Sequence, residues 1–231
     1  MNDLKNRQWK VCVKCSTYNH SQFITETLNG FTNQVTSFPF VCAIIDDAST
    51  DGESNVLKKY LHDYFDLNDS TITRNEDTED YELIFSQHKK NSNCFFAVVL
   101  LKYNHYSVKK SKKNYYAEWE EHATYIAFCE GDDYWIDQYK IQKQVAFLDK
   151  HVEYGSCYTD YHSVDGKGSI IEDDKRHSLM KRHFASGDLF SKHLKYNFIQ
   201  TCTFLYRSRL LDSNYLGIDS FDYTYFSFLA G

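Results

Sequence analysis

Short apolar runs alternate along this chain with segments in which apolar side chains recur every three or four positions. Residues 10–15 and 40–45 are runs of the first kind, typical of strands in a sheet that is covered on both faces. Between these runs, apolar residues follow the spacing of one helix face: Ile24, Leu28, Phe31 and Val35. Ser21 precedes this stripe and is the expected N-cap. The pattern therefore predicts a strand, a helix and a second strand, which is a βαβ unit.

The same rhythm continues through most of the remaining chain. A helix is expected from about Glu53, with one apolar side made of Leu57, Leu61 and Tyr64, followed by a weak strand at residues 70–74. Further strands are expected at 124–129, 155–160 and 201–207, and further helices at 137–151 and from Ser186. Residues 94–101 are also strand-like, but the surrounding residues 75–120 leave an inserted loop and a hairpin both open. We therefore expect a single α/β domain over residues 1–231, with a mixed, mostly parallel sheet flanked by helices.

The composition fits one domain and argues against nucleic acid as a partner. Of the 231 residues, 42% are hydrophobic, which is enough for one sizeable core. The net charge is −6 with both signs interspersed, so no nucleic-acid footprint is expected. One basic cluster is expected to be a solvated loop, with membrane-surface contact as the weaker alternative: Lys109, Lys110, Lys112 and Lys113. Because no apolar run approaches about 20 residues and the N-terminus lacks a signal-like segment, we expect a cytoplasmic protein.

Seven cysteines, an odd number, are scattered mostly through the strand-like runs. That pattern is typical of reduced, buried thiols. Cys12 and Cys15 form a C-x-x-C, but an odd separation in a strand places the two side chains on opposite faces, and no second pair follows. A zinc or redox role is therefore not expected.

Polar clusters follow three of the predicted strands. They read CSTYNH at residues 15–20, DDASTDG at 46–52 and EGDDYW at 130–135. Ligands bind open α/β sheets outside the carboxyl ends of the strands. If the three strands are neighbours, hydroxyls, an amide, an aromatic ring and several carboxylates converge on one crevice.

Three carboxylates lie within four residues in the last cluster: Glu130, Asp132 and Asp133. They repel one another unless a cation neutralises them, and hard oxygen ligands suit Mg²⁺ or Mn²⁺ completed by phosphate oxygens. Gly131 would let the backbone pass close to such a phosphate. Taken alone, the second cluster could be an ordinary strand-to-helix turn, and the acidic cluster could be a helix N-terminus. A diphosphate ligand is nevertheless expected without a P-loop, because neither G-x-x-x-x-G-K nor G-x-G-x-x-G occurs.

The segments TYNH, IIDDASTDG and YIAFCEGDDYWIDQYKIQKQVAFL resemble the family 2 glycosyltransferases, which have the Rossmann-like GT-A nucleotide-sugar fold. The resemblance covers about residues 10–65 and 122–231. It implies a nucleoside pocket and donor contacts made by Ser16, Thr17, Tyr18, Asn19, Asp47 and Ser49. Asp47 would accept a hydrogen bond from a uracil-like base.

In the same resemblance, Asp132 is the metal ligand of the family's D-x-D segment. Glu130 stands where the family has Asp, so a ribose or indirect metal contact is implied for it, while Asp133 would orient the metal or the sugar. The segment SFDYTYFSFLAG looks like the family's catalytic-base segment and nominates Asp222, with Asp219 as the rival and a helix N-cap as the alternative role.

The implied activity is inverting, metal-dependent transfer of a hexose from a nucleotide-diphosphate sugar, with UDP as the expected nucleotide. A glycan or lipid-linked acceptor is implied, which suits polysaccharide synthesis at the inner face of a membrane. One alternative is a non-catalytic or truncated nucleotide-sugar binding module, because residues 75–120 diverge and the chain ends about nine residues after Asp222, so the acceptor segment is expected to be short or missing. A nucleotidyltransferase would need a glycine-rich basic loop, which KCSTYNH does not supply.

Overall fold

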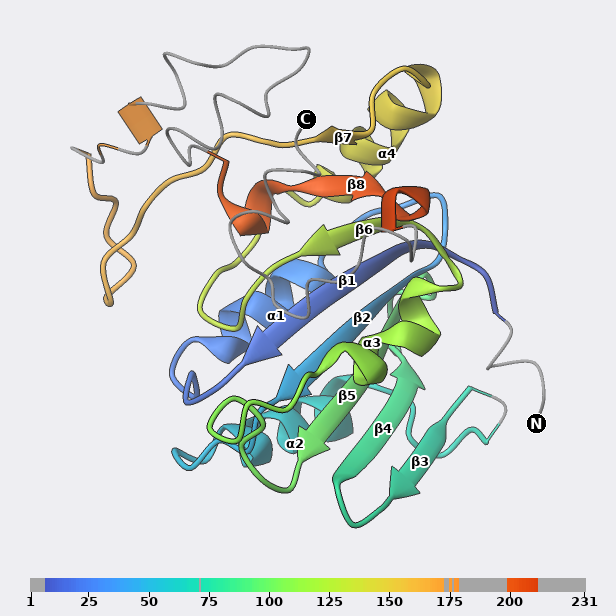
Figure 1. Ribbon diagram of the computed structural model, residues 1–231, viewed down its shortest axis with the longest axis vertical. Helices are drawn as coiled ribbons and strands as arrows, with labels where there is room; N and C mark the ends of the chain where they lie inside the picture. Colours follow the sequence, from blue (N-terminus) through green and yellow to red (C-terminus); the bar gives the residue numbers. More distant parts are fainter. Residues whose placement is uncertain (1–6, 71, 173–174, 176, 179–198, 212–231) are drawn as a thin grey trace.

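An eight-stranded sheet in the order β3-β4-β5-β2-β1-β6-β8-β7 organises the computed structural model (Figure 1), which describes residues 7–70, 72–172, 175, 177–178 and 199–211. The strands are β1 (Trp9–Thr17), β2 (Phe40–Asp46), β3 (Arg74–Asp77), β4 (Tyr81–Gln87), β5 (Cys94–Leu101), β6 (Ala123–Phe128), β7 (Ser156–Cys157) and β8 (Leu205–Arg207). The helices are α1 (Ile24–Thr32), α2 (Glu53–Tyr64), α3 (Lys113–Glu120) and α4 (Lys140–Lys150), with 3₁₀ turns η1 (Thr201–Thr203) and η2 (Ser208–Leu211).

The centre of the sheet is parallel, as the apolar runs predict. β5, β2, β1 and β6 are mutually parallel neighbours, and every residue of β2 and β5 is buried, because a strand covered on both faces has no side open to water. The outer strands pair antiparallel: β4 with β5, β3 with β4, β8 with β6 and β7 with β8. The expected α/β class is confirmed, and residues 81–101 form a hairpin rather than an inserted loop.

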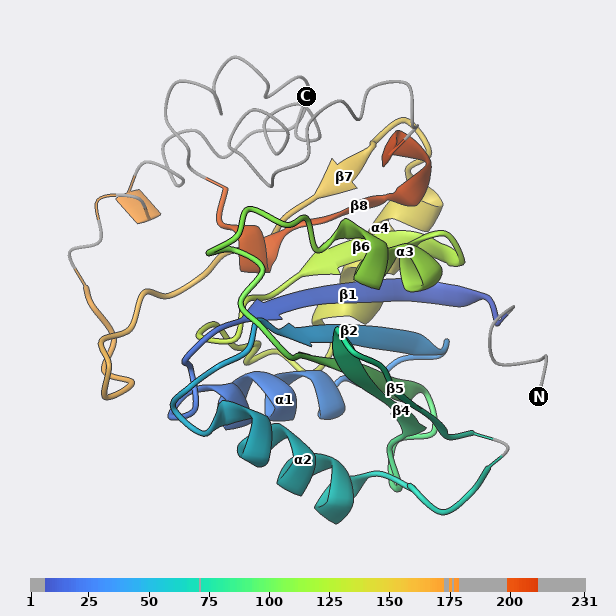
Figure 2. The same ribbon diagram turned by 60° about the horizontal axis from the view of Figure 1, so that its bottom comes forward.

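Helices cover the two faces of the sheet unequally. Figure 2 shows α1 and α2 on one side and α3 on the other. Residues of α4 belong to the same buried cluster as those of α1 and α2, whereas α3 residues share a cluster with Phe204 and with Tyr206 of β8 on the opposite face. Cys12 faces the α3 side and Cys15 the α1 side, so the two faces predicted for the C-x-x-C are confirmed. All seven cysteines are free.

The start and the end of α1 differ from the predicted stripe. The N-cap is Phe23 rather than Ser21, because the Ser21 amide instead donates to the Asp51 carboxylate at 2.9 Å. The helix ends at Thr32, and Val35 is 47% exposed. Gln34 turns inward in its place, since its side-chain amide donates to the Asp137 carbonyl at 2.9 Å. A polar residue that finds buried partners is as good an interior residue as a valine.

Other predicted boundaries shift by a few residues. On α2 the buried aromatic residue is Tyr60, while Tyr64 is 47% exposed. The strand expected at 70–74 lies at Arg74–Asp77, and only two residues of 155–160 form a strand. In the 201–207 run, the first three residues form η1, since Thr203 bonds back to the Gln200 carbonyl through both its amide and its hydroxyl. The helix from Ser186 and the segment around Asp222 lie outside the described residues.

Within the described part of the chain, no helix combines the length and the apolar character that crossing a bilayer requires.

Candidate functional site

The candidate site lies where the strand order reverses. β1 pairs in parallel with β2 on one side and with the much later strand β6 on the other. The chain therefore builds the sheet first to one side of β1 and later to the other, which makes the carboxyl ends of these strands the expected ligand crevice. In Figure 1 these three ends point to the same edge of the sheet. The backbones meet there: the Asp47 amide donates to the Thr17 carbonyl at 3.0 Å, and the Gly131 amide to the Ser16 carbonyl at 3.1 Å. The three polar clusters therefore form one site, as the sequence predicts.

A buried carboxylate joins the loop after β1 to the loop after β2. Glu53 is fully buried at the start of α2. It accepts hydrogen bonds from the Thr17 hydroxyl, from the His20 amide at 2.9 Å and from the Ser49 hydroxyl at 2.9 Å. Gly52 precedes it with φ of 93°, a left-handed conformation that favours glycine. Glu53 thus sets the relative position of two of the three site loops.

The same two loops exchange further bonds around Asn19. Its φ is 58°, which asparagine tolerates better than most residues. The side-chain oxygen of Asn19 accepts a hydrogen bond from the Thr50 backbone amide at 2.8 Å. The backbone amide of Asn19 donates to the Ser49 hydroxyl at 2.8 Å. Tyr18 beside it is 42% exposed. The ring of Tyr18 is therefore available at the rim, while Asn19 and Ser49 hold the loops together.

Asp47 is tied to the loop that carries most of the predicted basic cluster. This lysine loop, residues 102–112, donates to the Asp47 carboxylate from the His105 amide at 2.7 Å, the Tyr106 amide at 3.2 Å and the Lys112 ammonium at 2.9 Å. Asp47 is only 1% exposed. A nucleotide base can therefore hydrogen-bond to this carboxylate only if the lysine loop moves away from it.

The acidic turn, residues 130–133, is packed tightly against β1 and α1. A Cβ on Gly131 would lie 2.0 Å from the Thr17 hydroxyl oxygen and 2.5 Å from its Cβ. Gly131 is therefore required by the close approach of the turn to β1, a contact the phosphate argument did not foresee. From α1, the buried Thr27 hydroxyl lies 3.0 Å from the Gly131 carbonyl and 2.6 Å from the Asp133 carbonyl.

The three acids of this turn have different environments. Burial, with Asp133 as the next cause, raises the pKa of Glu130 to about 7, and burial likewise raises the pKa of Asp133. The Asp132 side chain is 52% exposed and faces the imidazole of His20, with 3.8 Å between Oδ2 and Nε2. Only Asp132 of the three is well placed to carry its charge into the crevice.

A divalent cation fits this arrangement. Mg²⁺ and Mn²⁺ commonly take one or two protein carboxylates and complete their shell with water and phosphate oxygens, and the crowded acids of the turn are stabilised by an added positive charge. Asp132 is the exposed carboxylate that would hold it. Among the described residues no group of three or more histidine, cysteine, aspartate or glutamate side chains is arranged to hold a metal ion.

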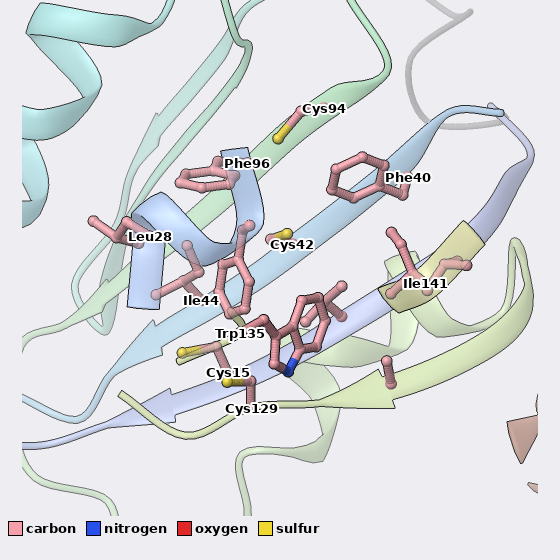
Figure 3. Packing of buried hydrophobic residues seen from close by; sticks show 14 of the residues in the cluster. Cys15, Leu28, Phe40, Cys42, Ile44, Cys94, Phe96, Cys129, Trp135 and Ile141 are labelled. Atoms are coloured by element: carbon pink, nitrogen blue, oxygen red, sulfur yellow. The ribbon is translucent and has the colours of Figure 1, made fainter. Parts of the chain in front are cut away.

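Trp135 anchors the far end of the acidic segment in the core. It is 7% exposed, and its indole donates to the Cys202 carbonyl at 2.9 Å. Figure 3 shows its ring above β1 with Cys15 and Cys129 beside it. The approach to α1 is close, because a Cβ on Gly30 would lie 2.8 Å from the Trp135 amide nitrogen. Trp135 is therefore a core residue and not an exposed ring on which a ligand could stack. Its hydrogen bond to Cys202 also places η1 next to the acidic turn.

Of the remaining predicted site residues, two lie at the end of β1 and two lie outside the described residues. The Ser16 hydroxyl is 2.8 Å from the Tyr116 hydroxyl of α3, and Thr17 is 2% exposed with its hydroxyl engaged by Glu53 and His20. Asp222 and its rival Asp219 lie outside the described residues.

Four residues that shape the site were not predicted to do so from the sequence: Glu53, Thr27, Lys112 and His20, which faces Asp132. His20 stands inside the quoted TYNH cluster, and Glu53 directly follows DDASTDG. Lys112 and Thr27 carried no local signal, because their partners are 65 and more than 100 residues away in the chain.

Known proteins resemble this chain in sequence and in fold. Residues 12–80 match the family described as Glycosyl transferase family 2. Uncharacterized proteins of Mycobacterium bovis and Mycobacterium tuberculosis are 31% identical over 191 residues, which is 83% of this chain and 45% of each relative. The chain thus spans less than half the length of the curated relatives it matches.

Two solved glycosyltransferase structures share the fold. Residues 1–349 of S. aureus TarS in complex with UDP have a TM-score of 0.55 at 19% identity, over 94% of this chain and 54% of that TarS chain. The mannosyltransferase PcManGT from Pyrobaculum calidifontis, in complex with GDP-Man and Mn²⁺, has a TM-score of 0.52 at 15% identity, over 91% of this chain and 48% of PcManGT. The predicted resemblance to family 2 glycosyltransferases is confirmed, and the fold is GT-A-like.

Proposed function

We propose that this chain, as one domain over residues 1–231, is a metal-dependent glycosyltransferase that moves a hexose from a nucleotide-diphosphate sugar to a glycan or lipid-linked acceptor. The observation that carries the proposal is the meeting of three polar loops at the carboxyl edge of β2, β1 and β6, with Asp132 turned outward. UDP is the proposed nucleotide, which is supported by TarS, whose solved complexes contain UDP and UDP-GlcNAc.

The chain's residues take defined parts in the proposed reaction. The end of β1 and the loops after β1 and β2 line the nucleoside pocket with these residues: Ser16, Thr17, Tyr18, Asn19 and Ser49. Asp47 receives the base after the lysine loop has moved. Glu130 contacts the ribose or supports the metal indirectly, and Asp133 orients the sugar end of the donor.

Chemistry at the anomeric carbon is a single displacement with inversion. The acceptor oxygen forms a bond to that carbon, the bond to the diphosphate oxygen breaks, and the acceptor proton goes to Asp222, the proposed base. Mn²⁺ or Mg²⁺ held by Asp132 would stabilise the negative charge of the departing diphosphate. Mn²⁺ is supported by its presence in the PcManGT complex. An acceptor carried on lipid is the reason to propose work at the inner face of a membrane.

The test compares transfer and donor binding in two variants. UDP-sugars are screened for transfer and for donor hydrolysis with wild type, Asp132→Asn and Asp222→Asn. We expect Asp132→Asn to lose metal-dependent donor binding, and Asp222→Asn to bind donor normally but lose transfer by at least about a hundredfold. Donor binding by wild type with neither transfer nor hydrolysis would instead identify a nucleotide-sugar binding module.

A further inference from the structure

His20 faces the exposed carboxylate of Asp132 across the candidate site. It lies in the loop after β1, and its Nε2 atom is 3.8 Å from Oδ2 of Asp132. That separation is too long for a direct hydrogen bond. An octahedral ion with bonds of about 2.1 Å holds two adjacent ligand atoms about 3.0 Å apart and two opposite ones about 4.2 Å apart. The observed separation lies between these values, so a small side-chain rotation brings both atoms onto one ion.

The hydrogen bonds behind His20 decide which ring nitrogen has a free lone pair. The Thr17 hydroxyl donates its single proton to the Glu53 carboxylate, so its oxygen can only accept from other groups. Nδ1 of His20 lies 3.2 Å from that oxygen, so Nδ1 carries a proton and donates. In the neutral ring the lone pair then belongs to Nε2, the atom that faces Asp132.

This arrangement matches the support that metal-bound histidines usually have. Such a histidine donates its other ring N–H to a fixed oxygen, which sets the tautomer and the ring orientation. Here the fixed oxygen is Thr17 Oγ1, which is itself held by Glu53. The backbone is fixed as well, because the His20 amide donates to Glu53 Oε2 at 2.9 Å.

The absence of a side chain at residue 131 lets the acidic turn lie close to Thr17 and His20. A Cβ on Gly131 would lie 3.1 Å from Nδ1 of His20 and would overlap Thr17. The acidic turn can therefore come close enough to bring Asp132 opposite the imidazole. Glu53, Thr17, His20 and Asp132 form a continuous chain of contacts from the start of α2 to the crevice.

We propose that His20 Nε2 and Asp132 Oδ2 together bind the divalent cation, and that His20 makes the site prefer Mn²⁺ over Mg²⁺. Nitrogen ligands suit first-row transition ions, whereas Mg²⁺ prefers oxygen ligands alone. This inference rests on the proposed function for the metal and the diphosphate, and adds the second protein ligand and the ion preference. The remaining coordination positions are left for water and the donor's phosphate oxygens.

The direct test is electron spin echo envelope modulation of Mn²⁺ bound to the protein with UDP. A coordinated imidazole nitrogen gives a ¹⁴N modulation, and selective ¹⁵N labelling of histidine changes that modulation without any mutation. Mn²⁺ affinity is measured in parallel from the signal of free Mn²⁺, with the contribution of UDP alone subtracted, and Mg²⁺ is used as the competitor.

Matched variants separate His20 from other histidines. We expect His20→Gln to lose the modulation, to bind Mn²⁺ at least about tenfold more weakly and to lose most of its preference over Mg²⁺. His62→Gln is the control, because His62 also lies 3.3 Å from an aspartate, Asp63, but on the outer surface with its side chain 84% exposed. The ¹⁴N modulation and the Mn²⁺ affinity should both be unchanged in His62→Gln.

The outcomes distinguish this inference from the proposed function. Mn²⁺ that binds only when Asp132 is present, with no histidine nitrogen in its spectrum, would overturn the role of His20 and leave the transferase proposal standing. No Mn²⁺ binding, or binding equal in wild type and Asp132→Asn, would overturn the metal site itself and the inference with it. The labelling experiment on wild type gives this answer even if His20→Gln does not fold.

Discussion

Gly131 occupies a position where even a methyl group does not fit. Its Cβ would overlap Thr17, which is held on its other side by Glu53, so neither partner can yield cheaply. We expect Gly131→Ala to lower the free energy of unfolding by about 1 to 3 kcal/mol, the usual cost of overpacking. Urea denaturation measures the change. Gly166→Ala is the control, because nothing lies within 4 Å of its Cβ, and a cost as large as that of Gly131→Ala would contradict this packing.

Lys140 is a buried lysine whose ionisation should show in the pH dependence of stability. Burial lowers its pKa from 10.5 to about 8, while its ammonium donates to Gln144 at 2.8 Å and lies 4.3 Å from the centre of the Trp135 ring. Between about pH 8 and pH 10.5, the two pKa values of Lys140, the unfolded chain binds more protons at this residue than the folded chain does. The free energy of unfolding attributable to Lys140 therefore rises with pH over that interval.

The measurement compares wild type with Lys140→Met between pH 7 and 10.5. At 1.36 kcal/mol per pKa unit, wild type should gain up to about 3 kcal/mol relative to Lys140→Met as the pH rises. Lys143→Met, an exposed lysine of the same helix, controls for the loss of one positive charge. Parallel pH curves for wild type and Lys140→Met would show that Lys140 keeps an ordinary pKa in the folded protein.

At the scale of elements, α1 and the acidic turn act as one unit. The Thr27 hydroxyl is the polar link between them, at 3.0 Å from one carbonyl of the turn and 2.6 Å from another. Thr27→Val should lower the free energy of unfolding by about 1 to 3 kcal/mol, because it removes the hydroxyl donor from the buried Gly131 carbonyl. It should also weaken metal-dependent UDP binding. Thr27→Ser should restore both.

The control for Thr27 is another buried threonine of the same helix. The Thr32 hydroxyl bonds to its own helix and to Tyr60, away from the turn. Thr32→Val is expected to cost stability without changing UDP affinity in the folded protein. If Thr27→Val and Thr32→Val had equal UDP affinities, α1 would not be positioning the turn.

Some elements were predictable from local pattern and others were not. The strand-like run at residues 94–101 coincides with β5, because an unbroken apolar run in a doubly covered sheet carries its own signal, although its surroundings were left open between an inserted loop and a hairpin. The end of α1 was missed, because Val35 continues the helical spacing while the inward turn of Gln34 depends on partners more than a hundred residues away. Periodicity reports the local preference of a segment and cannot report such distant partners.

At the scale of the whole molecule, the strand order decides where the site is. Alternating strands and helices predict parallel neighbours around β1, and their carboxyl ends then bring the three polar clusters together. The hairpin of β4 and β5 was left open, since antiparallel pairing at the edge of a sheet depends on long-range register rather than on composition. Consequently the convergence of the three polar clusters could be predicted from the sequence, while the contact of the lysine loop with Asp47 could not.

The central claim is that this fold holds a nucleotide diphosphate through a divalent cation at Asp132. Calorimetric titration of UDP into the protein, with Mn²⁺ and then with a chelator, tests it most directly when Asp132→Asn is titrated alongside. We predict binding to wild type that requires Mn²⁺ and is weakened at least about tenfold in Asp132→Asn. UDP binding of equal strength with Mn²⁺ and with chelator, unchanged in Asp132→Asn, would contradict it.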